Sequence, residues 1–84
     1  MHVQAVQNFR TNVRVAMSAR GWSQERLAHE AELSRPFLNR VLQGKQEPSL
    51  EVCDRIADAL HSELAALLSS PKKFLKILPG AIAG

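Results

Sequence analysis

Residues 23–44 read SQERLAHEAELSRPFLNRVLQG, and this stretch, with two apolar runs at helical spacing, decides the fold. A serine at an N-cap accepts a hydrogen bond from an unpaired amide of the first helical turn, and the apolar residue before it can pack on the fourth helical residue. Ser23 and Ser34 are both flanked in this way. The flanking pairs are Trp22 with Leu27 and Leu33 with Leu38. The stretch therefore predicts two short helices, residues 24–30 and 35–43, joined by a tight turn.

Eight residues in and just after this stretch fall in register with a known motif. They are Gln24, Leu27, Ala28, Leu33, Ser34, Leu38, Gly44 and Lys45. The pattern resembles the helix-turn-helix of the Cro and phage-repressor superfamily, which reads Ser-Gln-x-x-Leu-Ala, five residues, Ser-x-x-x-Ile or Leu, and then Gly-Lys. The match continues through residues 48–50 and 56–60 and covers roughly residues 9–68. The resemblance implies a compact, all-α, five-helix domain like that of lambda repressor, and a DNA-binding function.

Three further helices are expected around this motif. Residues 5–20 carry an apolar stripe and end before Gly21, which can take the left-handed conformation that terminates a helix. The stripe is Phe9, Val13, Ala16 and Met17. Ser49 is the expected N-cap of a fourth helix, which runs to about residue 60, and a short fifth helix is expected at residues 63–68. The stripe expected to be buried on the fourth helix is Leu50, Cys53, Ile56, Ala57 and Leu60.

Two features depart from the family pattern. Most members place glycine where this chain has Glu32, because that residue usually adopts a positive φ; a non-glycine residue there costs about 1 kcal/mol. Many members also bury an arginine of the first helix against a glutamate of the third, and the corresponding residues here are Met17 and Leu42. We therefore expect an apolar contact between Met17 and Leu42 in place of a buried ion pair.

The composition fits one small cytoplasmic domain. The 84 residues include no apolar run long enough to span a bilayer and no signal-peptide pattern. Cys53 is the single cysteine, and at these spacings it cannot complete a four-ligand zinc site with the histidines, which are His2, His29 and His61. No metal or cofactor is expected. The pattern also disfavours an enzyme, because no histidine lies beside a plausible nucleophile and no glycine-rich phosphate loop is present.

Charge is distributed unevenly along the chain. Residues 1–46 carry seven lysines and arginines against three glutamates, a net charge of +4, whereas residues 47–70 carry one arginine against five acidic residues, a net charge of −4. Residues 71–84 add three lysines. A basic half that holds the helix-turn-helix beside an acidic half is typical of a protein that meets DNA phosphates with one face.

The predicted helix at residues 35–43 carries the expected base-reading surface. In this architecture the helix enters the major groove by its N-terminal end, and residues i, i+1, i+4 and i+5 share its exposed face. These residues are Arg35, Pro36, Asn39 and Arg40. Arginine can donate two hydrogen bonds to guanine, asparagine suits adenine, and proline suits a thymine methyl; alternatively, both arginines merely neutralise phosphate. The expected phosphate-binding residues are Gln24, which looks like the family's phosphate-binding glutamine, Ser34, Phe37 and Lys45.

A two-fold dimer is expected, because one recognition helix reads only a few base pairs. The two recognition helices would then lie about 34 Å apart. The expected interface is formed by Leu64, Leu67 and Leu68. Residues 71–84 follow the expected domain, residues 1–70, as a basic and apolar tail. That tail has three possible interpretations: an added dimer contact, a segment that binds a partner protein or a membrane surface, or a loosely ordered end. Of these, packing against a partner subunit is favoured.

The leading interpretation is a sequence-specific DNA-binding transcriptional regulator, a dimeric repressor that reads a palindromic operator. Restriction-modification controller proteins and antitoxins share this fold. Residues 35–37 are similar to the Arg-Thr-Tyr of many controllers, and an antitoxin would use the tail to bind its toxin. From a different class, the chain could be a protein-interaction module that keeps the fold without specific DNA binding. Replacing Arg35 and Arg40 by alanine separates these cases, because only a DNA reader would lose specific binding.

Overall fold

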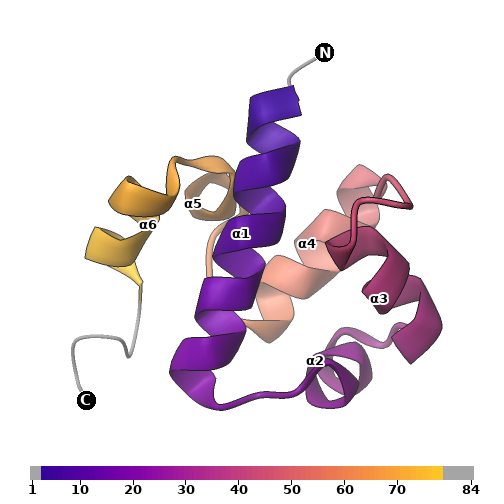
Figure 1. The fold of residues 1–84 in the computed structure, drawn as a ribbon. Coiled ribbons are helices and arrows are strands. Elements are labelled where there is room, and N and C mark those ends of the chain that lie inside the picture. The colour runs from indigo at the N-terminus through magenta and orange to yellow at the C-terminus, as the bar shows by residue number, and fades with distance from the viewer. Residues whose placement is uncertain (1–2, 79–84) are drawn as a thin grey trace.

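The computed structural model describes residues 3–78 and consists of six helices joined by short turns (Figure 1). They are α1 (Val3–Arg20), α2 (Gln24–Ala31), α3 (Arg35–Leu42), α4 (Leu50–Ala59), α5 (Leu64–Leu68) and α6 (Pro71–Ile77). The predicted all-α class is confirmed, and residues 3–78 contain no strand. α6 adds a sixth helix to the five that were expected. No helix in this part of the chain has the length and hydropathy needed to cross a membrane.

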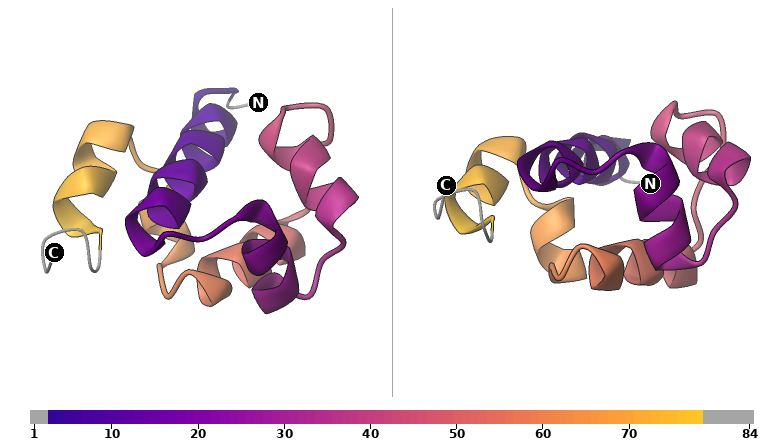
Figure 2. Two further views of the ribbon diagram at one scale, coloured as in Figure 1. Left: turned by 60° about the horizontal axis from the view of Figure 1, so that its bottom comes forward. Right: turned by 90° about the horizontal axis from the view of Figure 1, so that it is seen from below.

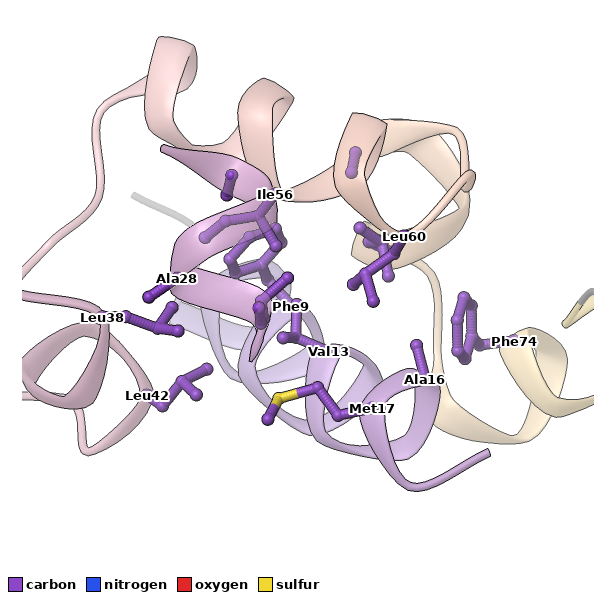
Figure 3. Close-up of a cluster of buried hydrophobic side chains, with 14 of the residues drawn as sticks. Phe9, Val13, Ala16, Met17, Ala28, Leu38, Leu42, Ile56, Leu60 and Phe74 are labelled. Carbon is purple, nitrogen blue, oxygen red and sulfur yellow. The ribbon is translucent and has the colours of Figure 1, made fainter. Parts of the chain in front are cut away.

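α1 is the longest helix and lies at the centre of the fold. α5 and α6 lie on one side of it and α3 on the other, as Figures 1 and 2 show. Its predicted stripe is buried, with the four side chains no more than 7% exposed. In Figure 3 these side chains point into the space between the helices, and those of Met17 and Leu42 point toward one another within one core cluster. Apolar packing thus replaces the family's ion pair at this place in the core.

Serine caps begin α2, α3 and α4. Ser23 Oγ accepts a hydrogen bond from the backbone N–H of Arg26, and Ser34 Oγ accepts one from the N–H of Phe37. The cap of α4 is equivalent, since Ser49 Oγ accepts from the N–H three residues later. The predicted N-caps are therefore confirmed, and they define where α2 and α3 begin.

The turn between α2 and α3 depends on a left-handed residue. Glu32 has φ 58° and ψ 45°, as the comparison with the family's glycine predicted. Its N–H still donates to the carbonyl oxygen of His29, and the next N–H, that of Leu33, donates to the carbonyl oxygen of Ala28. These bonds close α2 and direct the chain into α3 at a fixed angle.

Two leucines differ from their expected positions. Leu67 is fully buried within the monomer, so it cannot line a dimer interface. The domain's own core needs Leu67, because α5 packs on both α1 and α4. Leu64 is half-buried and Leu68 is 37% exposed, so their place in a dimer interface stays a prediction. Conversely, Leu50, which was expected to be buried, is 74% exposed, because it is the first residue of α4 and lies beyond the core.

Buried asparagines attach α5 to α1. Asn12, which is fully buried, donates from Nδ2 to the carbonyl oxygens of Leu67 and Ser69 at 2.9 and 2.8 Å. Asn8 Nδ2 donates to the carbonyl oxygen of Leu68 at 3.1 Å. The last carbonyls of a helix have no partner within the helix, so these amides satisfy groups that the core would otherwise leave unpaired.

α6 is formed by the first half of the basic and apolar tail. Phe74 is fully buried and Leu78 is 4% exposed, and both belong to the main core cluster. Ser70 caps the helix, since its Oγ accepts from the N–H of Lys73. Residues 71–78 thus pack against α1 and α5 of their own chain. The rest of the tail, residues 79–84, lies outside the described residues.

We expect Glu32→Gly to raise the free energy of unfolding by about 1 kcal/mol, because glycine adopts a positive φ without the Cβ clash. For a domain of this size, that change raises the melting temperature by roughly 4–8 °C. Calorimetry of the wild type, Glu32→Gly and Glu32→Ala measures the effect. Glu32→Ala removes the same carboxylate but keeps Cβ, so it is expected to give no such gain. A lower melting temperature for Glu32→Gly would refute the prediction.

We expect Asn12→Ala to lower the free energy of unfolding by about 2–4 kcal/mol, because carbonyl groups at the end of α5 lose their donor inside the core. Urea denaturation followed by circular dichroism measures this loss. Thr11→Ala, on the exposed side of the same helix, serves as the control and is expected to change stability by no more than about 0.5 kcal/mol. Equal midpoints for the two variants would show that the amide does not hold α5.

Candidate nucleic-acid interface

α3 presents one face to the core and the other to solvent. Leu38, Val41 and Leu42 are buried, as predicted. Of the predicted base-reading residues, Arg35, Pro36 and Arg40 are exposed, whereas Asn39 is half-buried. The four lie on the N-terminal half and middle of α3, which is the part of a recognition helix that meets base edges.

A hydrogen bond joins the predicted base-reading and phosphate-binding sets. Asn39 Nδ2 donates to Gln24 Oε1 at 3.0 Å, so the first residue of α2 contacts the middle of α3. An asparagine amide has two N–H donors and an acceptor oxygen, so Asn39 keeps one N–H and Oδ1 for a base. Gln24 likewise keeps its own Nε2 donors. The bond orients both side chains before any DNA is present.

Phe37 has a different role from the expected one. Its backbone N–H is donated to Ser34 Oγ at 3.2 Å and its ring is apolar, so Phe37 offers no donor to a phosphate and is removed from the phosphate-binding set. The ring instead lies beside Arg40, whose Cζ is 5.9 Å from the ring centroid. A guanidinium near an aromatic face is held by cation–π attraction. Phe37 therefore restricts the position of Arg40.

Two other predicted phosphate-binding residues remain accessible. Lys45 is exposed and directly follows Gly44, which has φ +80° and turns the chain after α3. Ser34 is also exposed; its Oγ accepts the cap bond, and its O–H is still available as a donor. Within residues 3–78, no carboxylate lies within ion-pair distance of Lys45, Arg35 or Arg40. The positive charge of these three side chains is thus not neutralised by the described part of the protein.

Two arginines of α1 hold α3 at its C-terminal end. The sequence did not indicate this role. Arg10 Nε donates to the carbonyl oxygen of Val41 at 2.9 Å, and Arg14 Nη2 donates to that of Leu42, also at 2.9 Å. The Arg10 side chain is only 19% exposed, and its Nη2 lies 3.9 Å from Glu47 Oε2. Cations are favourable at a helix C-terminus, where carbonyl groups point outward. The α1 arginines therefore fix the C-terminal end of α3.

The basic charge of residues 1–46 is partly used inside the protein. Arg20 Nη2 donates to the carbonyl oxygen of Leu60 at 2.7 Å, and Arg26 forms an ion pair with Glu30 at 3.1 Å. Both guanidinium groups also lie over the ring of Trp22, at 5.3 and 4.6 Å from its centroid. Trp22 is half-buried and packs on the core, as predicted. The net charge of this half therefore overstates the charge that can face phosphates.

Outside this surface, the nucleophilic and metal-ligating side chains of the described residues do not come together in a reactive site. Cys53 is half-buried, and burial raises the pKa of its thiol, which disfavours the nucleophilic thiolate. Among residues 3–78, no three His, Cys, Asp or Glu side chains gather as metal ligands would. The exposed surface of α3 is thus the best-defined candidate site.

Comparison with known proteins identifies the family to which the chain belongs. The helix-turn-helix family HTH_3 matches residues 13–67, which is more than half of the chain. A solved structure of a hypothetical transcription factor, NHTF from Neisseria, is 26% identical and has a TM-score of 0.80; the match covers 94% of this chain and 89% of that one. No curated protein matches the sequence. The chain therefore belongs to the Cro/C1-type helix-turn-helix family of DNA-binding transcription regulators.

Proposed function

We propose that this protein is a dimeric transcriptional repressor that reads a palindromic operator with α3 in the major groove. The observation that carries the proposal is the pair of exposed arginines on a helix whose two ends are both fixed. Ser34 caps the N-terminal end of α3, and the α1 arginines bind the C-terminal carbonyls. A rigid helix that presents unneutralised guanidinium groups fits direct base readout, because such readout requires donors held at fixed positions.

The proposed base contacts follow from the donors on α3. Arg35 and Arg40 each donate two hydrogen bonds to O6 and N7 of guanine. Asn39 accepts from N6 of adenine with Oδ1 and donates to N7 with the N–H that Gln24 does not use. Pro36 offers an apolar surface to a thymine methyl. Each half-site therefore contains guanine at two positions and adenine between them or beside them.

The proposed phosphate contacts fix the position of α3 on the duplex. Gln24 lies at the N-terminus of α2, where side-chain and backbone donors both meet a phosphate. Ser34 and Lys45 lie at the two ends of α3 and would bind phosphates on either side of the groove. Contacts of this kind hold register and orientation but do not select a sequence.

A two-fold dimer would place two copies of α3 on one face of the DNA. The domain measures 31 × 29 × 18 Å along its principal axes. A domain of this size fits beside a second copy over two successive major grooves, which lie about 34 Å apart. Occupancy of an operator by such a dimer represses by excluding other proteins from the same DNA, and this mode of action needs only the DNA-reading surface.

Selection of bound duplexes from a random DNA pool tests the proposal. We expect a palindrome whose half-site centres lie about one helical turn apart. On the selected duplex, Arg40→Ala is expected to weaken binding by about 1–3 kcal/mol and to relax the preference at one guanine. Lys72→Ala, which removes an exposed cation on α6, on the other side of α1 from α3, is the control and is expected to leave the preference intact. Equal weakening on all sequences would mean that Arg40 only neutralises phosphate.

Lys45→Ala is expected to behave differently from Arg40→Ala. Loss of one phosphate contact weakens binding to every sequence alike and reduces the slope of log affinity against log salt by about 0.9. Fluorescence anisotropy over a salt series, on the selected duplex and on a scrambled one, measures both effects. An unchanged slope would exclude Lys45 from the interface. Weak, sequence-blind binding by the wild type would instead favour the protein-interaction module.

A further inference from the structure

The loop between α3 and α4, residues 43–49, carries a carboxylate in a segment that is otherwise basic. Residues 33–50 contain three cations and a single acidic residue, Glu47. The cations are Arg35, Arg40 and Lys45. The loop lies on the α3 side of α1, away from α5 and α6 (Figure 1). A carboxylate in this place repels the phosphate that Lys45 is proposed to bind, because like charges repel.

Glu47 faces an arginine of α1. Its Oε2 lies 3.9 Å from Arg10 Nη2, which is beyond hydrogen-bond distance, and its side chain is 81% exposed. An ion pair this long and this exposed contributes little, because water and salt screen it. The Arg10 side chain, by contrast, is only 19% exposed. A largely buried cation thus has an acidic partner that holds it weakly.

The guanidinium group of Arg10 is fixed in position independently of Glu47. Its Nε donates to the carbonyl oxygen of Val41 at 2.9 Å. Its flat face lies against Gly44, where an added Cβ would be 3.5 Å from Cζ and 3.7 and 3.8 Å from Nη1 and Nε. Cζ is the nearest of these three atoms, as it is for a point above the guanidinium plane. Nε and one face are therefore engaged, whereas Nη1 and Nη2 donate no hydrogen bond to any of residues 3–78.

We infer that Arg10 binds a backbone phosphate of the DNA through Nη1 and Nη2, beside the phosphate contact of Lys45, and that Glu47 competes with that phosphate for Arg10. The inference rests on the proposed function and adds a contact from α1 to it. Lys45 directly follows Gly44, and its backbone N–H donates to the carbonyl oxygen of Arg40 at 2.9 Å. The loop therefore places the Lys45 backbone next to the guanidinium group. Phosphate and carboxylate oxygens are the same kind of acceptor for a guanidinium group, which pairs with either in a bidentate manner.

The exchange of Glu47 for a phosphate favours the DNA complex. Because Arg10 is already fixed, the contact does not require a flexible side chain to be ordered on binding. A phosphate at hydrogen-bond distance replaces a carboxylate at 3.9 Å, and a charge-assisted hydrogen bond is stronger than an exposed ion pair. Every nucleotide offers the same phosphate, so Glu47 lowers the affinity for all sequences alike and leaves the base preference unchanged.

Substitutions of Arg10 test the phosphate contact. Fluorescence anisotropy over a salt series measures binding of the full chain to the selected duplex and to a scrambled one. Arg10→Gln is expected to weaken binding to both duplexes roughly tenfold and to reduce the slope of log affinity against log salt by about 0.9. Arg10→Lys keeps the charge and is expected to keep the slope. An unchanged slope in Arg10→Gln, or the same reduction in both variants, would overturn the inference, because Arg10 would then act only by holding the end of α3.

Glu47→Gln tests the competition. It is expected to raise the affinity for both duplexes by about two- to fivefold and to have no effect when combined with Arg10→Gln, because no cation is then left to release. Glu25→Gln is the matched control, since it removes an exposed carboxylate beside Gln24, another proposed phosphate contact. Its effect is expected to be the same with and without Arg10. An equal gain from Glu47→Gln in both backgrounds would mean that Glu47 only repels DNA at long range, which would overturn the competition.

A set of modified duplexes gives a test that needs no substitution of Arg10. In each duplex, one phosphate is replaced by an uncharged methylphosphonate. At the phosphate that Arg10 binds, the gain from Glu47→Gln is expected to disappear, and at the others it is expected to remain. A gain that persists at every position of the half-site would contradict the inference even if Arg10→Gln proved unable to fold.

The same measurements distinguish failure of this contact from failure of the proposed function. The ratio of wild-type affinities for the selected and scrambled duplexes reports base reading alone. A retained ratio with a salt slope that ignores Arg10 would overturn only the phosphate contact. A wild type that binds both duplexes equally would instead contradict the proposed function, whatever the effect of Arg10 and Glu47.

Discussion

The fold depends on hydrogen bonds between polar side chains of α1 and the C-terminal carbonyl groups of the helices around it. The donors are Asn8, Arg10, Asn12, Arg14 and Arg20, and the carbonyls lie at or just beyond the ends of α3, α4 and α5. A helix leaves its last carbonyls unpaired, and burial without a donor would cost free energy at each of them. α1 thus holds three short helices that could not persist alone.

One consequence is that α3 and α5 share a single support. Arg10 and Arg14 hold the end of α3, while Asn12, which lies between them two residues from each, holds the end of α5. The placement of α5 relative to α3 is therefore set within one rigid helix.

Sequence patterns predicted the local features well and the long-range polar bonds poorly. Serine caps, the left-handed Glu32 and the apolar stripe of α1 depend on near neighbours, and each was confirmed. The roles of Asn12 and Arg10 depend on residues 31–57 positions away, so no local pattern could indicate them. Leu67 was misassigned because one leucine-rich turn fits a core and an interface equally well. α6 was missed because no resemblance covered it, although Ser70 and Pro71 form a good helix start.

The α1 hydrogen bonds join residues that are far apart in the sequence. This separation also constrains how a newly made chain acquires its structure. α1 precedes the other helices along the chain, but its donors find no carbonyl acceptors until residues 41–69 have been synthesised. Until then α2 and α3 are short helices without a support, and such helices are marginal in water. A partly synthesised chain therefore carries Arg35 and Arg40 without the framework that orients them. The framework that orients these two arginines is therefore complete only after residue 69 has been added.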